Sequence, residues 1–190
     1  MIDLPSWVSW SLFGLAASSI CAIIGLSIFA VLSGKFQFFP PPSGNSWQHR
    51  TFMALFRLFL YPLLALSLLD FESVAPADAL LQYTVGLALL VVGFALAFWI
   101  TFQMGWRNAF GEKHGLKTTG WFSISRNPVY VATWVGMIGW GLIANALLVW
   151  ILLTLWAAMY LLAPIFEEPW LEQQYGQDYL DYKRQTRRFL

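Results

Sequence analysis

Five apolar runs divide the sequence, and each is long enough to cross the roughly 30 Å of hydrocarbon in a bilayer as a helix. They cover residues 7–32, 51–69, 79–102, 128–146 and 147–165. Charged residues make up only 11% of the chain, against about 25% in soluble proteins. Residues 129–165 contain no charge, and Gly141 and Asn145 mark a turn that splits this stretch into two helices. The sequence therefore predicts an all-α integral membrane protein with about five transmembrane helices.

The basic residues predict the orientation, because loops rich in Lys and Arg stay on the cytoplasmic side. Ten of the eleven fall in the segments 33–50 and 103–127 and in the tail after residue 165. This alternation places the N-terminus outside and a helical C-terminal tail in the cytoplasm, in the inner or plasma membrane if the chain is bacterial. The start, MIDLPSW, lacks the basic region of a cleaved signal peptide, so we expect the first span to be permanent.

Several classes of partner are disfavoured, which leaves the lipid bilayer as the expected one. A net charge of +1 is too small for a nucleic-acid binder. His49 and His114 stand far apart and Cys21 is the only cysteine, so we expect no metal site.

Arg57 is the one basic residue inside a predicted span, one heptad after Arg50. A cation at membrane depth costs at least about 2.5 kcal/mol, so it is either a buried counter-charge for a ligand or a side chain that extends to the headgroups. Small residues four positions apart predict close helix packing. These pairs are Ser18 with Ala22, Gly93 with Ala97, and Ala132 with Gly136.

Most polar residues lie in the segments 103–127 and 166–190, so we expect any polar ligand to bind at the cytoplasmic face. Asn127 and Pro128 are typical of a helix start, and such an N-terminus binds carboxylates or phosphates. Glu167 and Glu168 close the fifth span, where two acids meet the negative end of the helix dipole. They are either a solvated pair or are compensated by Arg187, Arg188, Lys117 or a cationic ligand.

The ordered set of motifs in residues 100–190 resembles the isoprenylcysteine carboxyl methyltransferase and phospholipid methyltransferase superfamily of membrane enzymes. The set is Gln103-Met104-Gly105, His114-Gly115-Leu116-Lys117-Thr118-Thr119-Gly120, Arg126-Asn127-Pro128-Val129-Tyr130, Glu167-Glu168, Tyr175-Gly176, Tyr179, Tyr182 and Arg188-Phe189. Residues 1–102 then form the scaffold and acceptor part, and residues 103–190 form the cofactor-binding core.

The resemblance implies an S-adenosylmethionine-dependent methyltransferase that acts on a lipophilic or small acceptor. Glu168 is the candidate catalytic residue, as a proton acceptor. The candidate cofactor-binding residues are Arg107, His114, Gly115, Leu116, Lys117, Phe122, Asn127, Pro128, Val129, Tyr130 and Glu167.

Two departures from the family pattern bear on the substrate. Asn127 stands where the motif more often has histidine, and Leu161 to Phe166 lack the arginine that suits a prenylcysteine carboxylate. Two alternatives remain: an NADPH-dependent membrane reductase related to sterol reductases, and a non-catalytic membrane scaffold.

Overall fold

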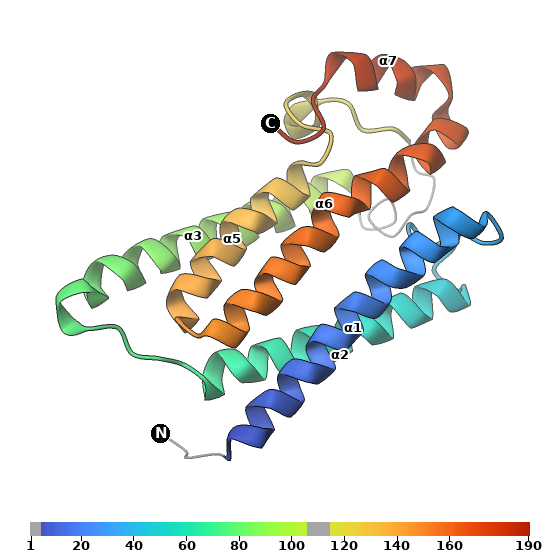
Figure 1. Cartoon of the computed structure of the whole chain (residues 1–190). Coiled ribbons are helices and arrows are strands. Elements are labelled where there is room, and N and C mark those ends of the chain that lie inside the picture. The colour runs from blue at the N-terminus through green and yellow to red at the C-terminus, as the bar shows by residue number, and fades with distance from the viewer. Residues whose placement is uncertain (1–4, 106–114) are drawn as a thin grey trace.

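The computed structural model describes residues 5–105 and 115–190, and every regular element in those ranges is a helix (Figure 1). The elements are α1 (Ser6–Ser33), α2 (Trp47–Leu69), α3 (Pro76–Met104), the 3₁₀ helix η1 (Gly120–Ser123), α5 (Pro128–Ala144), α6 (Leu147–Tyr175) and α7 (Gln177–Gln185). Four of them, α1, α2, α3 and α6, are long and apolar enough to cross a membrane, and α5 is a shorter apolar helix. The predicted all-helical membrane fold is confirmed. The side that the tail faces stays a prediction.

Two helix pairs, α1 with α2 and α3 with α5, are joined by α6, which lies between them (Figure 1). A buried apolar cluster fills the space where α1, α2 and α6 meet, and it includes Ile20, Phe59, Leu63, Leu152 and Trp156. At one end of the bundle the segment 115–127, α7 and the C-terminus come together (Figure 1). This end carries the polar segments that the sequence singled out.

Small residues allow the backbones of α3 and α5 to touch. A Cβ atom on Gly93 would lie 2.2 Å from the nitrogen of Gly136, and one on Gly139 would lie 2.2 Å from the nitrogen of Leu90. The predicted packing role is confirmed for the pairs on these two helices. It is wrong for Ser18, which is exposed on α1.

The turn between α5 and α6 lies where the sequence places it. Asn145 adopts the left-handed conformation (φ 50°), and its N–H donates to the carbonyl oxygen of Gly141. The end of the last span, however, is predicted wrongly. Helix α6 continues past Pro164 and Pro169 to Tyr175, so Glu167 and Glu168 lie two turns before its end and do not meet its negative dipole end.

Candidate functional site

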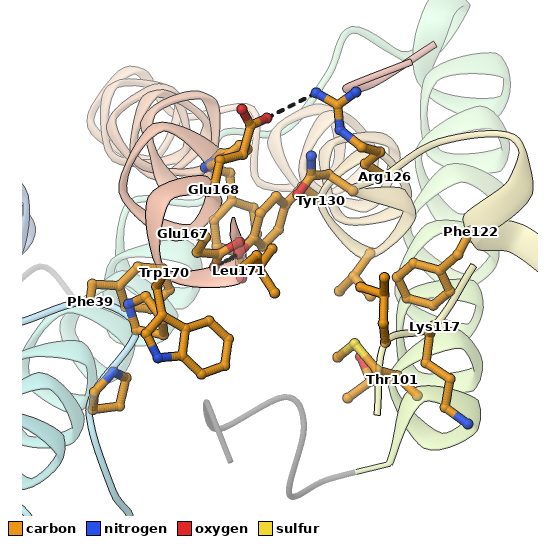
Figure 2. A pocket seen from close by; sticks show the side chains of 18 of the residues that line it. Phe39, Thr101, Lys117, Phe122, Arg126, Tyr130, Glu167, Glu168, Trp170 and Leu171 are labelled. Carbon is orange, nitrogen blue, oxygen red and sulfur yellow. Dashed lines mark hydrogen bonds and ion pairs between the residues drawn. The ribbon is translucent and has the colours of Figure 1, made fainter. Parts of the chain in front are cut away.

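A cavity of about 340 Å³ opens at the polar end of the bundle, within the size range of small-molecule sites (Figure 2). Its walls come from α2, the end of α3, the start of α5, the second half of α6, α7, and the segments 39–41 and 115–127. All predicted site residues that the structure describes line it, except Pro128, which begins α5. Arg107 and His114 lie outside the described residues. Within the described ranges, no group of three His, Cys, Asp or Glu side chains could hold a metal ion.

Glu167 places a carboxylate in the wall of the cavity. The hydroxyl of Tyr130 donates to Oε1 of Glu167 at 2.5 Å, and the ring of Tyr130 lies against that of Tyr160 with centroids 4.4 Å apart. The other oxygen, Oε2, receives no hydrogen bond from the described residues. Glu167 is therefore held in place by one oxygen and can accept from a ligand with the other.

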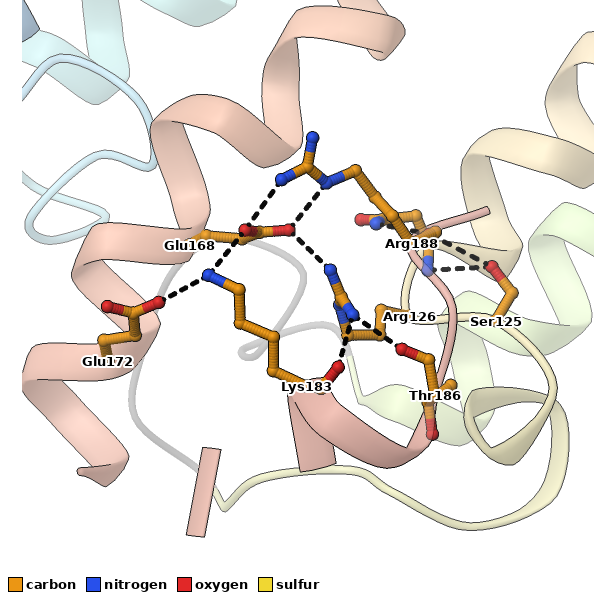
Figure 3. A network of polar contacts seen from close by, with 8 residues as sticks. Ser125, Arg126, Glu168, Glu172, Lys183, Thr186 and Arg188 are labelled. Carbon is orange, nitrogen blue, oxygen red and sulfur yellow. Dashed lines mark hydrogen bonds and ion pairs between the residues drawn. The ribbon is translucent and has the colours of Figure 1, made fainter. Parts of the chain in front are cut away.

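Glu168, its neighbour, lies in a network of three cations (Figure 3). Arg126 Nη2 lies 2.9 Å from Oε1, Arg188 donates to both oxygens at 2.8 and 2.9 Å, and Lys183 Nζ lies 3.1 Å from Oε2. The side chain is only 7% exposed. Of the predicted partners for the acids, Arg188 is confirmed. A carboxylate with every oxygen engaged by cations is a poor proton acceptor.

The same network binds the C-terminal tail to the start of α5. Arg126 Nη1 donates to the carbonyl oxygens of Lys183 and Thr186 at 3.0 and 2.6 Å, and Asn127 Nδ2 donates to that of Arg188 at 2.8 Å. Hydrogen bonds to Glu172 and Glu168 raise the pKa of Lys183 above its ordinary value, so this cation stays charged. The tail is thus part of the wall behind the cavity.

The start of α5 offers fewer backbone donors than its sequence suggests. Asn127 occupies the cap position, but its side chain does not cap the helix. Pro128 has no N–H, and the N–H of Tyr130 donates to the carbonyl oxygen of Asn127. Within the described residues, the N–H of Val129 is the first-turn donor without an acceptor. An anion at this helix end would contact Val129.

The first half of the chain supplies an aromatic wall that the sequence analysis missed. Phe39 stacks on Phe52 with centroids 5.2 Å apart, and Phe56 continues the row along α2 (Figure 2 shows Phe39). His49 lies beside them in the cavity wall, and its backbone N–H donates to the Ser46 hydroxyl that caps α2. These residues carry no recognisable motif, and the only sequence signal was the stiff Pro40–Pro42 segment.

Other lining residues also escaped prediction. The sequence indicates Arg126 only as part of a motif (Figure 2). Trp170 and Leu171 lie on the part of α6 that extends past the predicted span. Tyr179 and Tyr182 on α7 are buried, and the hydroxyl of Tyr182 donates to the carbonyl oxygen of Phe122 at 2.6 Å. Burial raises the pKa of Tyr182 to about 12, so it remains a neutral donor.

Residues 81–178, more than half of the chain, match the family model of phospholipid methyltransferases. The chain belongs to this family. The match runs from α3 through α5 and α6 to the first turn of α7, and so includes most of the cavity wall. No curated protein and no solved structure matches the chain. Membership supports a membrane methyltransferase in general, without naming the methyl acceptor.

Proposed function

We propose that this protein transfers a methyl group from S-adenosylmethionine to a lipophilic or small acceptor in the membrane. The observation that carries the proposal is the carboxylate of Glu167, which accepts a hydrogen bond from Tyr130 with one oxygen and none from the described residues with the other. It lies in a cavity that has a polar wall and an aromatic wall. Membership of the phospholipid methyltransferase family supports the reaction class.

The polar wall fits the groups of this cofactor. Glu167 Oε2 can accept from an ammonium or from ribose hydroxyls, and the N–H of Val129 and the ammonium of Lys117 can meet a carboxylate. Leu116 and Phe122 offer apolar surface for a base. The remaining predicted cofactor residues, Arg107 and His114 among them, stay part of this proposal.

The aromatic wall suits the acceptor, so the two parts of the chain have separate roles in binding. When bound, the cofactor would supply a methyl group on a sulfonium: the acceptor's nucleophile would bond to the methyl carbon in line as the C–S bond breaks, with the neutral thioether as leaving group. Phe39, Phe52 and Phe56 exclude water from that side and leave room for a lipophilic chain. Residues 1–102 then serve the acceptor, and residues 103–190 serve the cofactor.

Glu168 has a different role in this proposal from the proton acceptor that the sequence suggested. Its bonds to Arg126, Arg188 and Lys183 make it a positioning residue that holds the backbone next to Glu167. A protic acceptor would lose its proton to His49, which lines the cavity on the side of the aromatic wall. An acceptor that is already a carboxylate needs no such base.

The test is transfer of a labelled methyl group from S-adenosylmethionine in membranes that contain the protein, with a panel of membrane lipids and small thiols. We expect label in one acceptor fraction with wild type and with Glu172→Gln, whose side chain lies outside the cavity lining. The Glu167→Gln variant should label at a rate at least tenfold lower. Wild-type membranes that transfer no label above a vector control, but oxidise NADPH with a sterol-like acceptor, would instead support the reductase alternative.

A further inference from the structure

Arg57 lies on the exposed face of α2, away from the cavity. The cavity-lining residues of this helix are His49, Phe52, Met53 and Phe56, and Arg57 is not among them. We call the opposite surface the α2 arginine face, and it consists of Trp47, Arg50, Ala54, Arg57 and Tyr61, all exposed. The alternative that Arg57 is a buried counter-charge for a ligand is therefore wrong.

The depth of Arg57 makes its charge expensive in lipid. It stands ten residues after Trp47, which is about 15 Å along the helix axis. An uncompensated Arg near the middle of a membrane helix costs about 2.5–3.5 kcal/mol. Side chains of a helix point toward its N-terminus, so Arg57 extends back toward Arg50, two turns earlier on the same face.

The described residues supply no acidic partner for this face. Neither Arg50 nor Arg57 forms an ion pair within the described residues. The two helices that pack against α2 are α1, which has no charged residue, and α6, whose first acid is Glu167 in the cavity wall. Within residues 5–105 and 115–190 these two arginines thus have no counter-charge, and an anion of the bilayer can supply one.

We propose that the α2 arginine face binds an anionic phospholipid, with the headgroup phosphate between Arg50 and Arg57 and the acyl chains along Leu64 and Leu68. Both leucines are exposed further along the same helix. A guanidinium pairs with phosphate oxygens through two parallel hydrogen bonds. Trp47 and Tyr61 flank the arginines with side chains that suit the headgroup region. A second copy of this chain fits less well, because no described membrane-spanning helix exposes an acid near its middle.

The experiment is a competition between two lipids on the purified full-length protein. The protein in neutral detergent is mixed with equal amounts of phosphatidylglycerol and phosphatidylcholine that have identical acyl chains, and retained lipids are counted by native mass spectrometry. Wild type should retain more phosphatidylglycerol. The Arg57→Gln variant should lower that preference about fivefold, and Arg57→Lys should keep most of it.

The matched control is Arg184→Gln, which removes an exposed charge from α7 and should leave the preference unchanged. Thermal melting of each variant checks its fold, and Arg57→Gln should melt no lower than wild type because Arg57 has no partner in the described chain. An unchanged preference in Arg57→Gln overturns the proposal. An equal loss of preference in Arg184→Gln also overturns it, because that would mean unspecific electrostatic attraction. None of these outcomes depends on methyl transfer.

Discussion

Replacing Glu168 with glutamine should destabilise the protein much more than the same change at Glu172, one turn further along α6. Three cations converge on this carboxylate (Figure 3), but they differ in exposure. The side chains of Arg188 and Lys183 are 42% and 35% exposed, so water can solvate them when the carboxylate is lost. Arg126 is only 9% exposed and would keep a buried charge without an acid.

The buried charge of Arg126 therefore determines how much stability the protein loses in Glu168→Gln. Removing one partner of a buried ion pair costs about 3–5 kcal/mol. Arg126 keeps its bonds to the carbonyl oxygens of Lys183 and Thr186, which favours the lower end, about 3 kcal/mol. For a chain of this size, 1 kcal/mol corresponds to about 2–4 °C, so we expect Glu168→Gln to melt about 6–12 °C lower.

The assay is thermal melting in detergent, followed by tryptophan fluorescence, with Glu172→Gln as the control. Glu172 is 37% exposed and pairs with Lys183, and such surface pairs contribute about 0–1 kcal/mol. The control should melt within about 4 °C of wild type. If Glu168→Gln melts as high as Glu172→Gln, the network does not hold the tail, and the reasoning about Arg126 is wrong.

Three further predictions concern the ligand, the packing and the orientation. Glu167→Gln should weaken S-adenosylmethionine binding by roughly ten- to hundredfold, as measured by calorimetry. Its melting temperature should be unchanged, because the glutamine oxygen still accepts from the hydroxyl of Tyr130. Gly139→Ala should destabilise the protein by about 1–3 kcal/mol, because its Cβ would meet the α3 backbone. Gly14→Ala should stabilise it slightly, because nothing lies within 4 Å of the added Cβ. Equal melting temperatures of the two variants would count against the close contact between the helices. Cysteines introduced at Lys113 and Gln185 in a variant without its native cysteine should both resist an impermeant thiol reagent in intact cells, and labelling of one alone would contradict the predicted topology.

Features of the fold that depend on chain length and local chemistry could be predicted from the sequence. The bilayer fixes the length of an apolar helix, and Asn145 after Gly141 indicates the hairpin because asparagine tolerates the left-handed turn. The end of α6 could not be predicted in this way. Pro164, Pro169 and the acids between them are typical of a loop, but packing and the Arg126 network keep that segment helical as far as Tyr175.

The cavity could be predicted only on the side that carries motifs. Tyr130 belongs to the Arg126–Tyr130 motif that resembles the family, and Glu167 is one of two adjacent acids that follow the uncharged stretch 129–165. Phe39 and Phe52 are ordinary residues in a membrane protein that contains sixteen phenylalanines, and only the fold brings them to the cavity. The pairing of Arg126 with the tail was equally hidden, because the two segments lie about sixty residues apart in sequence.

Calorimetric titration of the purified protein with S-adenosylmethionine, and separately with NADPH, tests the proposed function most directly. We predict saturable binding of one S-adenosylmethionine per chain and no heat of binding with NADPH. Binding of NADPH without S-adenosylmethionine, or of neither, would contradict the methyltransferase proposal.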